Sequence, residues 1–376
     1  MLENKENLND LGIVSINLDS LKYNYKVIKE KLNKRTEIAA VLKANAYGLG
    51  IEKIATTLHK VGCELYFVAT LTEGIELRKF ITKPNILVLN GSPRYTRKVY
   101  YKFEKYRLIP VINSLNDLNL WLSLLKKKTD KSTIALHFDT GMNRLGIPYH
   151  DLNKVKKSIQ SIDKLNIFCV MSHLASADDE KNITNKIQKK LFDEIICEFP
   201  DTMKSLANSS AIFNLKGYDY SFVRSGGGLF GINPNKKDKN LKNVISVKAK
   251  ILQIRDLENE PIKSVGYNST YSVRSSLRIA VLGIGYADGY PRNLSNIGYG
   301  IFKTKKLPIV GNISMDYMTV DISCIKDKEI NVGDWVELIG DEITIQKVAK
   351  LSETIEYEIL NNLGYRLQKD YISSKK

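Results

Sequence analysis

The sequence is poor in the residues that build disulfide frameworks and metal sites. It has four cysteines and four histidines in 376 residues, and the cysteines lie far apart, with no CxxC pair and no cluster with histidine. No apolar run is long enough to span a membrane, and the opening segment MLENKENLND lacks the apolar core of a signal peptide. We therefore expect no metal, no membrane association and a cytoplasmic location.

Acidic residues are outnumbered by basic ones. There are 41 Asp and Glu against 57 Lys and Arg, for a formal charge of +16. The cations are mostly lysines spread along the chain, and no nucleic-acid-reading motif accompanies them. We interpret them as a solvated surface that weakly attracts anionic metabolites, with no nucleic-acid partner. The alternative, a basic nucleic-acid-binding protein, would require strong salt-dependent association with random duplex DNA.

The first two-thirds of the chain alternates short apolar runs with segments of helical periodicity. Helices are expected at Ile51–Val61, Arg94–Tyr106, Leu115–Lys127 and His150–Leu165. Strands are expected at Ile38–Leu42, Leu65–Thr70, Asn85–Leu89, Leu108–Ile112, Thr133–Phe138, Ile167–Ser172, Met203–Ala207 and Tyr220–Val223. Eight strands that alternate with helices are typical of a (β/α)8 barrel.

After about residue 240 the pattern changes to strands joined by short turns. Strands are expected at Lys248–Ile254, Ser276–Gly283, Leu307–Val310, Asp316–Ile322 and Trp335–Leu338, with one helix at Thr344–Leu351. We predict an α/β fold with two domains: an N-terminal (β/α)8 TIM-type barrel over residues 1–240 and a C-terminal mostly-β domain over 241–376.

Active sites of such barrels lie at the C-terminal ends of the strands. The residues that follow the predicted strands there are Lys43, Asp139 with Arg144, His173, Asn208 with Ser209, and Arg224 with Gly226, Gly227 and Gly228. Each alone has an ordinary explanation, such as a solvated lysine, a core histidine, a helix cap or a turn. Together they place an amine, a cation, an imidazole and a glycine-rich anion cradle on one rim. A phosphate-bearing ligand beside a lysine suggests a carbonyl cofactor held as an imine.

These motifs resemble those of a known family. AVLKANAYGLG around Lys43 looks like the pyridoxal-phosphate lysine motif of alanine racemases. Seven further segments resemble segments of that family in the same order: DTGMNRLG, SHLASAD, LANSS, VGYNSTY, GIGYADGYPR, VGNISMDYM and LGYR. The likeness spans about Val14 to Tyr371. It implies a pyridoxal 5'-phosphate-dependent racemase that interconverts L-alanine and D-alanine, supplying D-alanine for peptidoglycan. It also implies a homodimer whose active sites combine one barrel with the partner's β domain.

The resemblance implies two opposed acid/base groups. Lys43 would carry the cofactor as a Schiff base, and Tyr267 would reach in from the other subunit, so that one group removes the Cα proton and the other returns one on the opposite face. The pKa values of amines and phenols are ordinarily near 10, so both must be lowered for this work. Arg224 would donate to the pyridine nitrogen and keep it unprotonated, which disfavours side reactions such as transamination.

The remaining roles also follow from the resemblance. His173 would hydrogen-bond Arg224, and the phosphate would be contacted by Tyr47, Ser209, Gly226, Gly227 and Tyr365. The substrate carboxylate would be held by Arg144 and the backbone at Met315, with support from Asp316. The positions that match the entry corridor are Asp178, Tyr286 and Arg292. Two positions depart from the family pattern. His137 stands where some members carry a carbamylated lysine, and Asn312 where a corridor arginine is common.

Three other enzymes or carriers share parts of this pattern. A serine or broad-specificity racemase would keep most of the motifs. A basic amino-acid decarboxylase of the same fold has a similar glycine run, but LKANAYGLG and DTGMNRLG fit racemases better. A non-enzymatic pyridoxal-phosphate carrier resembles the barrel alone, which the β domain argues against.

Overall fold

The computed structural model describes residues 11–92, 94–125, 132–160, 162, 165–235, 240–273 and 276–374. The chain divides into two compact units. The first, which we call the barrel unit, comprises Leu21–Ala46 and Gly50–Lys242. The second, the β unit, comprises Tyr47–Leu49, the chain from Asn243 onward and the N-terminal segment up to Ser20.

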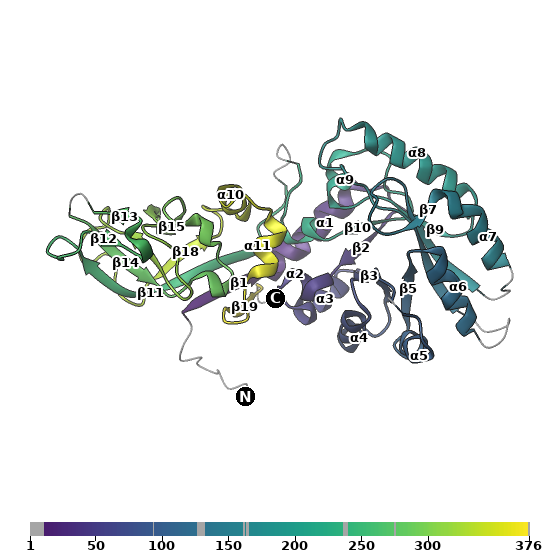
Figure 1. Cartoon of the computed structure of the whole chain (residues 1–376), viewed down its shortest axis with the longest axis horizontal. Helices are drawn as coiled ribbons and strands as arrows, with labels where there is room; N and C mark the ends of the chain where they lie inside the picture. The colour runs from purple at the N-terminus through teal and green to yellow at the C-terminus, as the bar shows by residue number, and fades with distance from the viewer. Residues whose placement is uncertain are drawn as a thin grey trace. The chain divides into compact units, whose positions relative to one another are not determined.

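The barrel unit is built on eight parallel strands, so the predicted barrel is confirmed (Figure 1). In spatial order they are β10 (Phe222–Ser225), β2 (Glu37–Val41), β3 (Leu65–Val68), β4 (Asn85–Val88), β5 (Leu108–Ile112), β6 (Ser132–Asp139), β8 (Leu165–Met171) and β9 (Met203–Ser205). The short β7 (Ile147–Pro148) pairs with β6. Between β9 and β10 the closure rests on isolated bonds such as Arg224 N to the Ala207 carbonyl, at 2.9 Å, so the barrel is nearly closed.

Alternate strand residues fill the barrel interior. Leu65 and Phe67 of β3 and Val111 of β5 belong to one buried cluster with Phe222 of β10. The rings of Phe67 and Phe222 stack with centroids 6.0 Å apart. This packed interior matches the layered side-chain core expected of such a barrel, and it places the polar strand ends at its rim.

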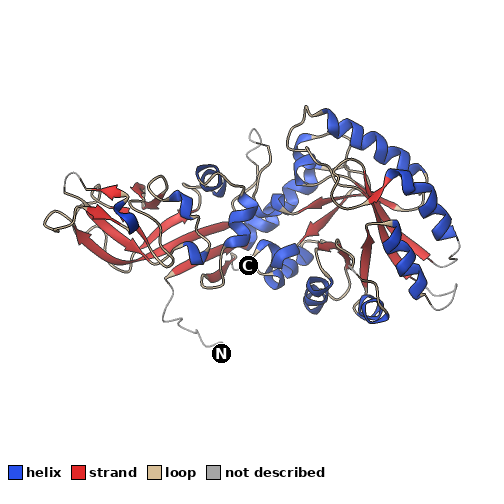
Figure 2. Cartoon of the chain, in the orientation of Figure 1, coloured by secondary structure: helices blue, strands red, loops and turns tan. Residues whose placement is uncertain are grey.

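Helices surround the strands of the barrel unit (Figure 2). They are α1 (Leu18–Lys31), α2 (Lys43–Tyr47), α3 (Ile51–Lys60), α4 (Leu71–Phe80), α5 (Arg97–Lys105), α6 (Leu115–Leu124), α7 (Leu152–Gln160), α8 (Ile183–Cys197) and α9 (Ser209–Asn214). The predicted helix at Arg94–Tyr106 begins later because the Thr96 hydroxyl caps it. The predicted helices at Leu115–Lys127 and His150–Leu165 extend into residues 126–127, 161, 163 and 164, which lie outside the described residues.

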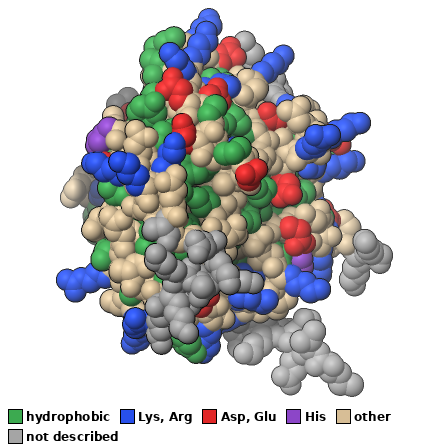
Figure 3. Space-filling model, turned by 90° about the vertical axis from the view of Figure 1, so that its right-hand side faces the viewer, with side chains coloured by type: hydrophobic (Ala, Val, Ile, Leu, Met, Phe, Trp, Pro, Cys, Tyr) green, Lys and Arg blue, Asp and Glu red, His purple; other side chains and the backbone are tan. Residues whose placement is uncertain are grey.

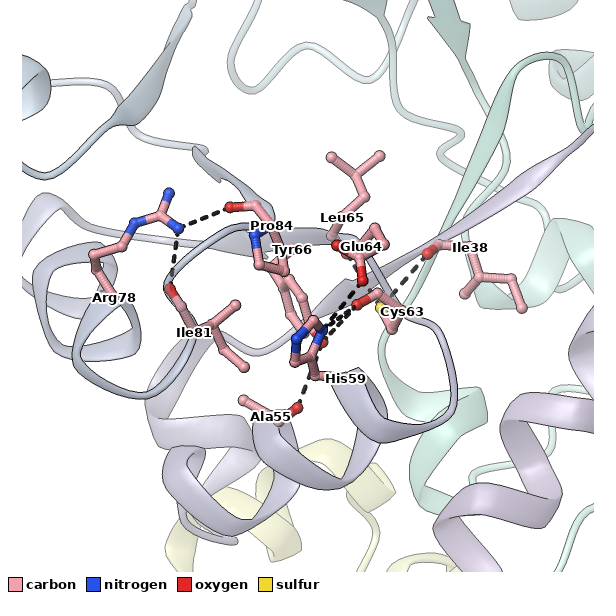
Figure 4. A network of polar contacts seen from close by, with 10 residues as sticks. All are labelled: Ile38, Ala55, His59, Cys63, Glu64, Leu65, Tyr66, Arg78, Ile81 and Pro84. Atoms are coloured by element: carbon pink, nitrogen blue, oxygen red, sulfur yellow. Dashed lines mark hydrogen bonds and ion pairs between the residues drawn. The ribbon is translucent and has the colours of Figure 1, made fainter.

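Several polar side chains at the N-terminal ends of the barrel strands donate hydrogen bonds to backbone carbonyls (Figure 4). The buried Tyr66 hydroxyl donates to the Cys63 carbonyl at 3.0 Å. Arg78 of α4 donates through Nη1 to the carbonyls of Ile81 and Pro84, at 3.0 and 2.8 Å. These bonds fix the helix-to-strand connections on the edge of the barrel away from the predicted site.

The β unit is a mostly antiparallel sheet, as predicted (Figure 2). Its elements are β1 (Gly12–Asn17), β11 (Ile245–Asp256), β12 (Ser264–Val265), β13 (Tyr271–Ser272), β14 (Arg278–Leu282), β15 (Tyr299–Phe302), β16 (Lys305–Pro308), β17 (Met318–Asp321), β18 (Trp335–Ile339), α10 (Ile345–Leu351), α11 (Glu356–Asn362) and β19 (Gln368–Ile372). The long strand β11 pairs with β1, β14 and β18.

The first strand of the chain belongs to this sheet. The predicted division assigned residues 12–17 to the barrel domain, but β1 pairs antiparallel with β11 and parallel with β19. Its alternating burial, with Val14 and Ile16 fully buried, provides the physical reason, because one face of the strand packs into the core of the β unit. The sequence pattern also missed β15, β19 and α11.

One face of the molecule carries side chains of both charge signs. Figure 3 shows Lys and Arg side chains scattered over one face of the molecule, with Asp and Glu between them. Among the helices that the structure describes, none has the length and apolar character needed to span a membrane.

Candidate active site

The C-terminal ends of the barrel strands bring five of the predicted side chains into one electrostatic cluster. Desolvation, followed by the charges of Arg224, Arg144, His137 and Lys43, lowers the pKa of His173 well below its ordinary value. Lys43 follows β2, Arg144 follows β6 and His173 follows β8. A histidine surrounded by cations is neutral at physiological pH.

Arg224, on β10, is a buried cation without a carboxylate partner. Its Nη1 donates to the Ser205 carbonyl at 3.0 Å and to the Ser205 hydroxyl at 2.7 Å, and its Nη2 donates to the Ser172 carbonyl at 2.5 Å. Within the described residues no acidic group pairs with it, and its Nε has no acceptor. Burial lowers its pKa to about 10, so it remains protonated. A buried guanidinium with a free donor is suited to a ligand atom that accepts a hydrogen bond.

His173 accepts a hydrogen bond from this arginine. Arg224 Nη2 lies 3.3 Å from His173 Nδ1, the contact that the family resemblance implies. Because a guanidinium only donates, Nδ1 carries the lone pair and the imidazole proton resides on Nε2. The His173 carbonyl and the Ala175 N–H both bond the side chain of buried Gln188, at 2.9 Å each. The side chain of Gln188, on α8, therefore fixes the loop after β8 through these two hydrogen bonds.

His137, on β6, is fixed as a neutral imidazole. Its Nδ1 lies 2.7 Å from Asn113 Oδ1, and the amide of Asn113 donates to the carbonyls of Leu89 and Val111. The Asn113 oxygen is therefore the acceptor and His137 Nδ1 carries the proton. Burial, with the cation of Arg224 as the next cause, lowers the pKa of His137 to about 3.

An anion cradle lies at the ends of β9 and β10. The Ser209 hydroxyl accepts from the N–H groups of Gly226 and Gly228, at 3.2 Å each. The Gly227 N–H between them has no acceptor among the described residues. Asn208 caps α9 by accepting from the Ala211 N–H at 3.0 Å, which leaves the first N–H groups of that helix to other acceptors. Such grouped N–H donors suit a phosphate.

Lys43 opens a left-handed turn. Ala44, Asn45, Ala46 and Tyr47 all have φ between 53° and 57°. Left-handed backbone costs non-glycine residues roughly 1–2 kcal/mol each, so other contacts must hold the turn. Asn45 Oδ1 accepts from the Ile51 N–H at 2.8 Å, and the Ala44 N–H donates to Glu73 at 2.7 Å.

The accessible amine of Lys43 is less basic than an ordinary lysine. Desolvation, and then the cation of Arg144, lowers its pKa, while the carboxylate of Glu73 acts in the opposite direction. A lower pKa leaves a larger fraction of the amine neutral, which is the form that attacks a carbonyl carbon.

Two of the predicted tyrosines of the β unit are exposed, and a third is buried. Tyr267 is 69% exposed and Tyr365 is 95% exposed. Asn312 holds the Tyr267 loop, since its Nδ2 donates to the Tyr267 carbonyl at 3.0 Å. Asn312 thus has a structural contact in place of the arginine common in the family. Tyr47 is buried, with its ring 5.9 Å from that of Tyr357.

Arg366 joins the loops that carry Tyr286, Met315 and Tyr365. Its guanidinium binds both carboxylate oxygens of Asp288 at 2.9 Å and one oxygen of Asp316 at 2.7 Å. The buried Asp288 also accepts from the Gly285 N–H at 2.9 Å. A Cβ on Gly285 would lie 2.3 Å from the Met315 carbonyl oxygen, so this close loop contact requires glycine.

Comparison with known proteins agrees with this geometry. The family models of the alanine racemase N-terminal and C-terminal domains match residues 16–234 and 244–371. The chain belongs to the alanine racemase family. It is 37% identical over 337 residues to the alanine racemase of Rickettsia bellii, covering 89% of this chain and 81% of the relative, and 35% identical over 377 residues to that of Brucella suis, covering 96% and 93%.

Solved alanine racemases share the fold of this family member. The Bartonella henselae enzyme, whose structure contains covalently bound pyridoxal phosphate, has a TM-score of 0.90 and 37% identity, covering 97% of this chain and all of that one. The biosynthetic alanine racemase of Pseudomonas aeruginosa has a TM-score of 0.88 and 28% identity, covering 97% of this chain and 100% of that one.

The predicted site residues of this alanine racemase family member fall into two sets. The barrel unit holds Lys43, His137, Arg144, His173, Asp178, Ser209, Arg224, Gly226 and Gly227; the β unit holds Tyr47, Tyr267, Tyr286, Arg292, Met315, Asp316 and Tyr365. Sequence reasoning missed Asn113, Gln188 and Arg366. Asn113 directly follows a predicted strand, so the strand-end rule could have found it. Gln188 lies inside a helix, where no such rule applies.

Proposed function

We propose that the protein is a pyridoxal-phosphate-dependent alanine racemase that interconverts L-alanine and D-alanine. The observation that carries the proposal is the contact of buried Arg224 with half-buried His173, which has no carboxylate partner among the described residues and lies on the same rim as Lys43. An isolated buried cation is costly unless a ligand or hydrogen bonds compensate it. Family membership supports alanine as the substrate, and a serine or broad-specificity racemase is the alternative.

The residues present fit pyridoxal phosphate. The unpaired Nε of Arg224 can donate to a ring nitrogen, and the N–H groups at Gly227 and the start of α9 can hold a phosphate with Ser209. The lowered pKa of Lys43 suits covalent attachment. In the β unit, Tyr47 and Tyr365 match further phosphate contacts. When bound, the cofactor supplies an electron-accepting ring that makes the Cα proton of an amino acid removable.

Lys43 and Tyr267 are the proposed acid/base pair. An amine with a lowered pKa can take up the Cα proton, and a phenol can deliver one to the opposite face. Arg144, which has no protein partner among the described residues, is the proposed ligand of the substrate carboxylate, together with the backbone at Met315. Asp316 supports this region through Arg366, and His137 lies beside Arg144.

We also propose that the enzyme is a homodimer with shared active sites. Tyr267, Tyr286, Met315, Tyr317 and Tyr365 are all exposed in the β unit, and apolar side chains gathered on functional loops favour a partner surface. In this proposal the barrel unit of one subunit faces the β unit of its partner.

A cytoplasmic location and a role in supplying D-alanine for peptidoglycan complete the proposal. All four cysteines are free, which suits a reducing compartment.

The test is incubation with L-alanine and pyridoxal phosphate in D2O, with Cα exchange and inversion followed together. Deuterated D-alanine is the expected product, and L-serine in a parallel reaction measures substrate range. Exchange without inversion would contradict the two-base assignment, and neither signal with any amino acid would refute racemisation.

Tyr267→Phe separates the two acid/base groups. Loss of the phenol should abolish inversion and slow proton exchange from one enantiomer far more than from the other, because Lys43 still serves one face. Tyr101→Phe, which changes an equally exposed tyrosine on α5, is the matched control and should behave as wild type. Equal, near-wild-type exchange from both enantiomers in Tyr267→Phe would exclude its role.

A further inference from the structure

Glu73 links two strand ends at the lysine site. It lies in the first turn of α4, and its Oε1 accepts from the Ala44 N–H at 2.7 Å. Its Oε2 accepts from the N–H groups of Ala69 and Thr70, at 2.7 and 3.1 Å. One carboxylate thus joins the turn after β2 to the turn after β3.

Helix capping explains only part of this arrangement. Thr70 and Glu73 form a reciprocal capping box, which accounts for the bond to the Thr70 N–H. It does not account for Oε1, which reaches a different segment of the chain. That oxygen bonds the residue directly after Lys43, where the left-handed turn begins. Because hydrogen bonds to a charged acceptor are stronger than neutral ones, this contact is suited to hold an unfavourable backbone conformation.

We propose that Glu73 is a positioning residue of the active site, which clamps the left-handed turn at Ala44 and so fixes the direction in which the Lys43 side chain leaves the barrel. The proposal deepens the proposed function and rests on it for the role of Lys43. The carboxylate has a second effect through its charge. It opposes desolvation and Arg144, and so limits how far the pKa of Lys43 falls.

The test uses variants of Glu73 with a matched control on the same helix. Glu73→Ala removes both acceptor oxygens, and Glu73→Gln keeps the size but removes the charge and one acceptor. Glu76→Ala is the control, because Glu76 is an acidic residue of α4 that pairs only with Lys79 among the described residues. Two readouts are independent of catalysis: hydrogen exchange of the Ala44 amide, and the rate of reductive methylation of Lys43 in protein freed of cofactor.

We expect the Ala44 amide to exchange at least about tenfold faster in Glu73→Ala than in wild type, because its acceptor is lost. In Glu73→Gln, loss of the anion should lower the pKa of Lys43 and speed its methylation about threefold, because a larger fraction of the amine is then neutral. Lys53 on α3 is an internal reference whose rate should not change. Racemisation should lose kcat in Glu73→Ala with little change in KM.

The outcomes separate this inference from the proposed function. Suppose that wild type racemises alanine but both Glu73 variants match Glu76→Ala in Ala44 amide exchange, Lys43 methylation and kcat. The positioning role of Glu73 is then refuted and the proposed function stands. If wild type racemises nothing while Ala44 exchange and Lys43 methylation still change, the function fails and the clamp stands. If Glu73→Ala does not fold, Glu73→Gln decides, since an Ala44 amide exchange rate, a Lys43 methylation rate and a kcat that all match Glu76→Ala would overturn the proposal.

Discussion

His137 should make the barrel unit sensitive to acid. Burial, followed by the cation of Arg224, lowers its pKa from 6.5 to about 3. A base whose pKa is lower in the folded state binds protons more readily when unfolded, so protonation favours unfolding. Its contribution is fully present above pH 6.5 and is lost as the pH falls from 6.5 toward 3. At about 1.4 kcal/mol for each pKa unit, roughly 3 kcal/mol is lost by about pH 4.5.

The variant that isolates this effect is His137→Gln. Glutamine can still donate to Asn113 but does not titrate. The free energy of unfolding of this variant should therefore fall about 3 kcal/mol less than that of wild type between about pH 7.5 and 4.5. His150→Gln is the matched control, because the His150 side chain is 79% exposed. It should keep the wild-type pH dependence.

Urea unfolding followed by tryptophan fluorescence provides the measurement. The chain has two tryptophans: Trp121 is fully buried in the barrel unit and Trp335 lies on β18 of the β unit. A Trp335→Phe background therefore makes the signal specific to the barrel unit. If His137→Gln and His150→Gln show the same loss of stability on acidification, the argument from the buried imidazole is refuted.

Two further substitutions test contacts at the site. Arg366→Ala leaves the buried Asp288 carboxylate without its cation and should lower the stability of the β unit by roughly 1–3 kcal/mol in urea unfolding followed at Trp335. Arg255→Ala, which breaks an exposed pair, should cost less than about 1 kcal/mol, and equal effects of the two would contradict a stabilising Arg366–Asp288 pair. Ser209→Ala removes the acceptor of two glycine N–H groups and should weaken pyridoxal-phosphate binding at least about tenfold in equilibrium titration. The control is the neighbouring Ser210→Ala, and equal binding by the two variants would exclude a phosphate contact of Ser209.

Much of the fold could be predicted because local patterns determine it. The barrel strands are short apolar runs separated by amphipathic helices, and all eight were predicted at nearly their observed positions. The missed elements depend on distant partners. β1 and β19 are short, mixed in polarity and stabilised by each other and by β11, which no local pattern reveals.

The site was predictable at the strand ends and less so elsewhere. Lys43, His173 and Arg224 follow from the barrel rule, since parallel strands bring their ends to one rim. The left-handed turn at Ala44 was not predicted, because alanine and tyrosine disfavour that conformation and only tertiary contacts such as Glu73 hold it. The roles of Tyr267 and Tyr365 rest on the family resemblance alone.

The pairing of β1 with β11 and β19 has a consequence for biosynthesis. A ribosome makes β1 first and β19 last, with the whole barrel sequence between β1 and β11. The barrel unit contains all of its own strands and can close while the chain is still growing. The sheet of the β unit cannot be completed until β19 has been synthesised, so the backbone donors and acceptors of β1 stay unpaired while the barrel unit folds.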